Sequence, residues 1–143
     1  MKKSISLAGI LFPMLLVMGC AGSGGKGVGQ LIPAIESDQT AILVMRDTGF
    51  SGTAALVEVA VDGIPIGDLG NKESLLHPVS PGDHTVAVRF KGIGGLGLNK
   101  EMKSFSVENG EKVFYQINLK MGLLTNELVL NGVTKETFIF ADQ

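Results

Sequence analysis

The chain has 143 residues, the length of a single domain, and its 12 basic and 14 acidic side chains leave a net charge of −2 at pH 7. This weakly acidic balance offers no positively charged surface to nucleic acid or to anionic lipid. Cys20 is the only cysteine, so no intramolecular disulfide can form. Aromatic side chains are few, with seven Phe, one Tyr and no Trp, which argues against a platform for stacking sugars.

Residues 1–19 have the order of a secretory signal peptide. Two lysines form a basic start, and an apolar core runs from Ile5 to Met18. This core is short for a membrane span, and Pro13 interrupts it. We therefore expect the segment to direct export and to be removed.

The end of this segment, Val17-Met18-Gly19-Cys20, resembles the lipobox of bacterial lipoproteins. The resemblance implies cleavage before Cys20, a diacylglycerol on its sulfur and often a further acyl chain on the new amino group. Two or three such chains anchor a protein durably, because each buried methylene contributes about 0.8 kcal/mol. Ala21 stands where an aspartate retains enterobacterial lipoproteins in the inner membrane, so the resemblance implies the outer membrane and a periplasmic face, with the inner membrane as the lesser alternative. The other reading is an ordinary signal peptide with an incidental Cys20.

The lipidated cysteine and a glycine-rich tether are expected over residues 20–30, followed by the folded domain over 31–143. The run 21–29 (AGSGGKGVG) is typical of a flexible coil and spans about 15–18 Å. Residues 30–40 are ambiguous and indicate at most a short lead-in strand.

The first strand is predicted over 41–46, where an unbroken apolar run is typical of a central, buried position. A turn-rich loop over 47–53 follows. Residues 57–61 alternate between valine and smaller or polar residues, which predicts a half-buried strand. This strand stops at Asp62-Gly63, a strong hairpin signal.

Four further strands are expected over 84–90, 104–108, 113–120 and 124–130, followed by a tail over 134–140 that is either an edge strand or a short helical turn. Pro-Gly-Asp at 81–83 turns the chain into the first of them, and Asn-Gly at 109–110 is expected as a second hairpin turn. Asn-Gly at 131–132 is expected to break the last. Phe114 points away from its neighbours, so it either caps a second hydrophobic layer or is exposed. Seven or eight short strands without sustained helical periodicity predict an all-β, antiparallel β-sandwich.

Three segments carry a resemblance to PEGA-like domains and to a related family of small bacterial lipoproteins of unknown function. They are 59–67 (VAVDGIPIG), 81–86 (PGDHTV) and 110–115 (GEKVFY). The resemblance covers 41–120 and implies a carboxypeptidase-regulatory-like or immunoglobulin-like sandwich. The family has no agreed activity, so the resemblance implies no catalytic residue.

The glycine-rich loop at 92–98 satisfies the letters of G-x-G-x-x-G after a predicted strand. Dinucleotide binding needs a helix that opens on this motif, and too few residues separate it from the next strand for such a helix. A flexible loop between strands is therefore expected. Ile93, Leu96 and Leu98 would then form either an exposed apolar contact surface or a simple cover over the open end of the sandwich.

His77, His84 and Asp83 are the candidate metal ligands. A zinc site needs three or four converging ligands, and neither a third histidine nor a free cysteine is present. We therefore expect both histidines to flank turns and to be exposed to solvent, and we expect neither a metal nor another cofactor besides the lipid on Cys20.

Glu58 and Asp62 are the candidate pair of catalytic carboxylates, but Glu58 falls on the solvent face of its strand. No serine stands in a G-x-S-x-G motif. The sequence therefore predicts a tethered, non-enzymatic binding or structural module of the cell envelope, with the bilayer and an envelope protein or itself as partners. Two alternatives stay open: an enzyme or accessory of envelope remodelling with a cleft that includes several of Glu58, Asp62, Asp68, His77 and His84, and a carrier with a large apolar cavity.

Overall fold

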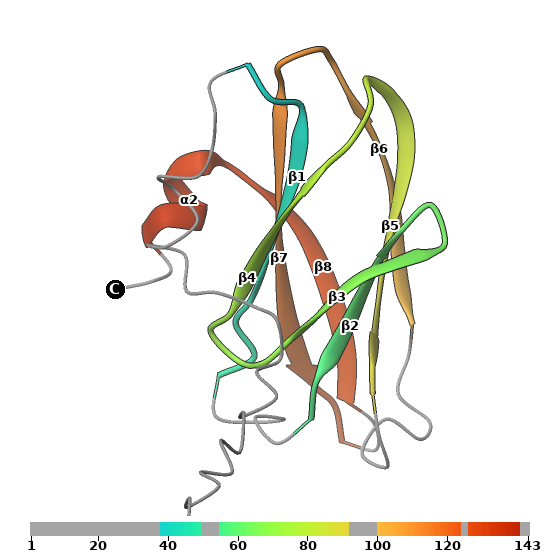
Figure 1. Cartoon of the computed structure of the whole chain (residues 1–143). Coiled ribbons are helices and arrows are strands. Elements are labelled where there is room, and N and C mark those ends of the chain that lie inside the picture. Colours follow the sequence, from blue (N-terminus) through green and yellow to red (C-terminus); the bar gives the residue numbers. More distant parts are fainter. Residues whose placement is uncertain (1–37, 50–54, 92–99, 124–125, 141–143) are drawn as a thin grey trace, which may run out of the picture.

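The computed structural model describes residues 38–49, 55–91, 100–123 and 126–140, with side chains of the last helix described through Phe138. Within these residues the chain forms two stacked layers of strands and one short helix (Figure 1). The elements are β1 (Ala41–Arg46), β2 (Val57–Val61), β3 (Ile64–Leu69), β4 (Ser74–Pro78), β5 (Gly82–Phe90), β6 (Glu101–Val107), β7 (Lys112–Met121), β8 (Asn126–Val133) and α2 (Lys135–Phe140).

The strands divide equally between two sheets. Sheet 1 has the strand order β4-β1-β7-β8, and sheet 2 has the order β3-β2-β5-β6. Neighbouring strands are antiparallel except β1 and β7, which run parallel from Ala41 opposite Lys112 to Arg46 opposite Ile117. The predicted all-β sandwich is confirmed, with this one parallel pair inside it.

The main core lies between the two sheets. Alternate residues of each strand face inward because successive side chains of a strand point to opposite faces. Val57, Val59 and Val61 of β2 are buried in this way, as the alternation predicted. They meet Ile42 and Val44 of β1 in the same cluster.

Strand β1 is buried on both of its faces, which explains its unbroken apolar sequence. All six of its residues are buried, and it lies between β4 and β7, as expected of a central strand. A second, smaller core covers its outer face and contains Phe138 of α2 with Ala41, Leu43 and Met45. The short helix therefore acts as the cover of β1.

The Asp62-Gly63 hairpin is confirmed. Val61 pairs with Ile64, so the two residues form the whole turn between β2 and β3. Both have positive φ angles, 50° for Asp62 and 79° for Gly63. A two-residue turn with two positive φ angles matches the twist of the strands that it joins.

The second predicted hairpin, at Asn109-Gly110, is wrong. Gly110 has the expected positive φ of 77°, and the amide of Glu111 donates to the carbonyl of Glu108. However, β6 belongs to sheet 2 and β7 to sheet 1, so this turn carries the chain from one layer to the other. The turn chemistry is local, whereas the choice of pairing partner is not.

The C-terminal part differs from the prediction at one point, the break expected at Asn131-Gly132, and it decides two alternatives that the sequence left open. Strand β8 begins at Asn126 and runs through Asn131-Gly132 to Val133, because β7 remains paired along its whole length. The tail is a helix and not an edge strand. Phe114 caps a second hydrophobic layer, with its ring centroid 5.4 Å from that of Phe138.

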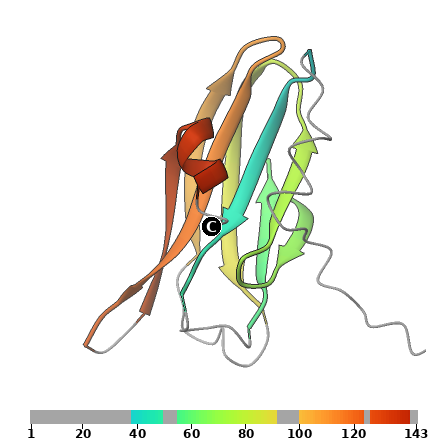
Figure 2. The same ribbon diagram turned by 90° about the vertical axis from the view of Figure 1, so that its left-hand side faces the viewer.

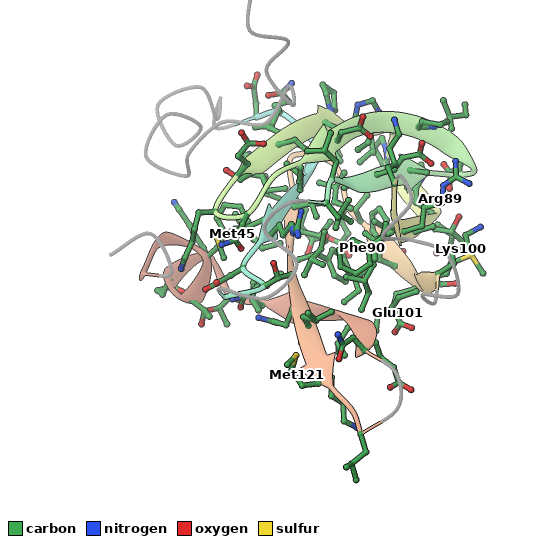
Figure 3. The ribbon with its side chains drawn as sticks, turned by 90° about the horizontal axis from the view of Figure 1, so that it is seen from below. Met45, Arg89, Phe90, Lys100, Glu101 and Met121 are labelled. Atoms are coloured by element: carbon green, nitrogen blue, oxygen red, sulfur yellow. The ribbon has the colours of Figure 1, made fainter. Side chains whose placement is uncertain are left out.

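The β7–β8 ribbon extends past one of the two ends of the sandwich. We call the end where β1 begins the proximal end and the end where β1 stops, at Arg46, the distal end. Beyond Ile117, the β7–β8 pair continues alone to Met121 and Asn126, and this ribbon projects past the body (Figure 2). Seen from the distal end, Phe90 lies between the sheets and Met121 lies on the projecting ribbon (Figure 3).

Candidate functional site

One polar constellation beside an open hollow is built on Asp62 and His84. Nδ1 of His84 lies 2.7 Å from Oδ2 of Asp62, and Nε2 lies 2.7 Å from the backbone oxygen of Ser80. Oδ1 of Asp62 accepts the backbone N–H of Thr85 at 2.8 Å. His84 thereby ties the β2–β3 turn to the connection between β4 and β5.

The expectation that His84 is exposed to solvent is wrong, since only 10% of its side chain is accessible. The ring lies against Phe105 of β6, with 5.5 Å between the ring centroids. His84 follows the inward alternation of β5, which places the ring at the end of the core. His77 is half-buried.

The hydrogen bonds favour the protonated form of His84. A carbonyl oxygen and an ionised carboxylate can only accept, so both contacts are hydrogen bonds only when both ring nitrogens donate, as they do in an imidazolium. The bond to Asp62, followed by the bond to Ser80, raises the pKa of His84 above its ordinary value. The same bond from His84, followed by that from Thr85, lowers the pKa of Asp62.

A hollow of about 530 Å³ opens beside this pair. Asp62, His77 and His84 supply its ionisable groups, and its apolar wall comes from β3 and from the connection between β4 and β5. Three of the five residues named for an enzymatic cleft thus meet on one surface. Glu58 and Asp68 do not belong to it.

The geometry limits what this hollow can do chemically. An Asp–His pair assists a nucleophile when the far ring nitrogen is free to accept a proton from a hydroxyl. Here Nε2 of His84 is bonded to the carbonyl of Ser80, and the hydroxyl of that serine is not its partner. In this arrangement the imidazolium holds two segments together, and it can serve as a general base only after releasing Ser80.

A second polar cluster lies on the outer face of sheet 2. Glu58 accepts a hydrogen bond from Arg89 at 2.7 Å and lies 3.9 Å from Lys91, which also pairs with Asp68 at 2.7 Å. Glu58 faces outward as predicted, yet only 12% of its side chain is accessible because the two basic chains cover it. The bond from Arg89 lowers the pKa of Glu58. These charges neutralise one another beside a hollow of about 240 Å³.

A third hollow, of about 630 Å³, lies on the outer face of sheet 1 beside α2. Phe114, Val133 and the hydroxyl residues Thr134 and Thr137 contribute to its wall. The two threonine hydroxyls lie 3.2 Å apart, and that of Thr134 accepts the backbone N–H of Thr137. Thr134 therefore caps the start of the helix, as Thr does at such positions.

Several predicted site residues lie outside the described residues. These are the lipidation residue Cys20 and the loop residues Ile93, Leu96 and Leu98. Within the described ranges, no three His, Cys, Asp or Glu side chains gather as a metal site would require. No helix in the same part of the chain is long and apolar enough to span a membrane.

Sequence reasoning missed Arg46, which is fully buried at the distal end. Its Nη1 donates to the backbone oxygens of Ala55 and of Leu69, the latter at 2.9 Å. Its guanidinium lies 5.5 Å from the ring centroid of Phe90. Burial lowers the pKa of Arg46. An arginine closing an unbroken apolar run was the signal available in the sequence.

Sequence reasoning also missed the apolar tip of the β7–β8 ribbon. Met121 is 66% exposed and Leu123 is fully exposed. The ribbon's register could not be read from the sequence, so its projection beyond β1 was not foreseen.

Neither a comparison with models of known protein families nor a search of curated proteins finds a match for this chain.

Proposed function

We propose that the chain is a lipid-anchored, non-enzymatic β-sandwich on the periplasmic face of the outer membrane that binds another component of the cell envelope. The observation that carries the proposal is the gathering of exposed apolar side chains at the distal end. This end is opposite to the one where the chain from Cys20 enters β1. We propose that the anchor attaches on the side where β1 begins and that the distal end meets the partner.

The direction of the strands supports this arrangement. Strand β1 begins at the proximal end, and β7 runs parallel to it, so the β7–β8 tip is distal. Met121 and Leu123 are exposed there. Large exposed apolar side chains grouped at one end are typical of interaction sites.

The residues that flank the glycine-rich loop lie at the same end. Lys91 directly follows β5 and Lys100 directly precedes β6, and Arg46 contacts the neighbouring Phe90 at the distal end. The loop's apolar members Ile93, Leu96 and Leu98 are therefore our candidates for the contact surface, together with the ribbon tip.

The pairing of the polar groups favours binding over catalysis. His84 has both ring nitrogens engaged, and Glu58 and Asp68 are neutralised by basic neighbours. A catalytic site instead keeps a group free and tuned for proton transfer. The resemblance to PEGA-like lipoproteins agrees with a module of this kind.

The anchor is tested on the full chain expressed in a Gram-negative host. Mass spectrometry of the amino-terminal peptide should find Cys20 as the first residue, carrying diacylglycerol and acyl mass. Cys20→Ala should leave the protein soluble in the periplasm or unprocessed. An unacylated Cys20 in membrane-bound protein contradicts the anchor. Crosslinking in intact cells, followed by identification of the crosslinked neighbours, then tests whether an envelope component is bound.

The second candidate is an enzyme or accessory of envelope remodelling, favoured by the hollow that contains Asp62, His77 and His84. Purified protein incubated with isolated peptidoglycan would then release soluble fragments. His77→Ala should abolish the release, whereas Met121→Ser at the distal end should not. Equal release by both variants, or none by the parent, counts against this candidate.

A further inference from the structure

The two sheets end in four border strands, β4 and β8 in sheet 1 and β3 and β6 in sheet 2. Among the strands that the structure describes, none pairs with the outer edge of any of the four. An open edge presents a row of unpaired N–H and C=O groups that invites another strand. Proteins therefore guard such edges with proline, bulges, short length or inward-pointing charge.

Three of the four edge strands have at least one of these features that discourage pairing with another strand. Strand β3 contains Pro65, and its pairing with β2 has a register shift. Strand β4 has five residues and ends at Pro78. In β6, Glu101 and Lys103 follow the same alternation as Phe105, which packs on the core, so two charged residues occupy inward positions.

Strand β8 has none of these features that discourage pairing. It has eight residues without proline, lysine or arginine, and its pairing with β7 continues without a shift from Met121 opposite Asn126 to Phe114 opposite Val133. Glu127 is its only charged residue. In Figure 2, β8 forms the outer border of sheet 1.

We propose that the outer edge of β8 pairs antiparallel with β8 of a second copy of this chain, so that two four-stranded sheets join into one. The pairing is centred on Val129. This proposal goes beyond the tethered binding function and holds whether or not Cys20 is acylated.

The alternation of inward and outward side chains limits the registers that a two-fold axis allows. Leu128 and Leu130 face the core, and a two-fold axis keeps them inward in both copies only when the axis passes through a residue pair. Axes at Val129 and at Leu130 use equally long parts of the strand, and the axis at Val129 is the one that places Glu127 opposite the polar Asn131 and not opposite Val133. It places Leu128 opposite the partner's Leu130 and Val129 opposite its own counterpart.

Charge complementarity favours a second copy as the occupant. In this register, Glu127 faces the partner's Asn131, so its carboxylate meets an amide donor and not a second carboxylate. The side-chain amide of Asn131 donates one hydrogen to Oδ1 of Asn118 at 3.2 Å. Its second amide hydrogen can be donated to the carboxylate of the partner's Glu127. No like charges oppose each other, which is the condition for favourable cross-strand pairs.

The test uses the full chain in membranes of the expression host, with single cysteines added to the parent. Val129→Cys should give a disulfide-linked dimer on mild oxidation, since the two-fold axis brings the two positions together. Val133→Cys on the same strand and Ser104→Cys on β6 should give no more disulfide-linked dimer than the parent. Links of equal yield at all three positions, no link at Val129→Cys, or a link from Val129→Cys to a different protein each overturns the proposal.

A second measurement does not depend on disulfide geometry. The detergent-purified parent should sediment as a dimer, and Val129→Lys should sediment as a monomer with a parent-like far-ultraviolet spectrum. Asn131→Lys serves as an independent variant if Val129→Lys loses that spectrum. Ser104→Lys is the matched control and should remain dimeric. A monomeric parent, or a dimer that survives both β8 substitutions, overturns the proposal.

Discussion

Asp62 and His84 form an ion pair across 22 residues of sequence, with Nδ1 of His84 2.7 Å from Oδ2 of Asp62. The pair connects the two-residue turn between β2 and β3 to the connection that leads from β4 in sheet 1 to β5 in sheet 2, because the other ring nitrogen binds Ser80. Its strength depends on pH through both partners.

The first prediction concerns the pH dependence of stability. The raised pKa of His84 means that its contribution is complete below the unfolded value, about 6.5, and is lost as pH rises through the folded pKa. The lowered pKa of Asp62 means that its contribution is present above about 3.9 and is lost as pH falls through the folded pKa. The melting temperature should therefore fall from pH 6 toward pH 9.

His84→Gln tests this pH dependence. Glutamine keeps an amide donor at every pH, so the variant should melt lower than the parent at pH 6 and lose the decline above pH 6. Asp62→Asn should weaken the same decline. A His84→Gln protein that retains the full slope would assign the pH dependence to other groups.

The second prediction concerns Arg46. Arg46→Met fills much of the same volume but leaves the backbone oxygens of Ala55 and Leu69 without their donor. Each buried, unsatisfied polar group costs about 1–3 kcal/mol, so the free energy of unfolding should fall by roughly 2–5 kcal/mol in urea denaturation. The matched control, Arg89→Met, removes a 60% exposed side chain and should change stability by no more than about 1 kcal/mol.

The third prediction concerns the cover of β1. Phe138 is 1% exposed and packs on Ala41, Leu43 and Met45, so Phe138→Ala should cost about 3 kcal/mol or somewhat more. The helical contribution to circular dichroism should fall as α2 loses its anchor. Glu136→Ala, on the exposed side of the same helix, should lower stability far less than Phe138→Ala does. Comparable losses in both variants would contradict the role given to Phe138.

The fourth prediction places the binding surface at the distal end. Leu123→Ser, and separately Leu96→Ser with Leu98→Ser, should reduce the yield of crosslinked envelope partner by at least about fivefold, as expected for anchor residues worth more than 1 kcal/mol. Leu123 is fully exposed, so the melting temperature of Leu123→Ser should match the parent. Ile64→Ser, which changes an exposed side chain beside the Asp62-Gly63 turn, should leave the yield unchanged. A lower melting temperature for the Leu96→Ser and Leu98→Ser protein would assign that loop to the core.

The sequence was sufficient for features that depend on neighbouring residues. Period-two alternation identified β2 and its buried valines, because the geometry of a strand places alternate side chains on one face. Asp62-Gly63 identified its hairpin because the turn needs two positive φ angles. The unbroken run at 41–46 identified a strand buried on both faces, although it did not show what covered it.

Only the tertiary structure decided which segments meet. Asn109-Gly110 has a sequence signal similar to that of Asp62-Gly63, yet only its glycine has a positive φ, and it joins two different sheets because nothing local to a strand specifies its partner. The parallel pairing of β1 with β7, the burial of Arg46 and the charge on His84 likewise arise from residues distant in sequence. Burial and hydrogen bonding at these sites depend on long-range packing, whereas periodicity and turn preference are properties of a few adjacent residues.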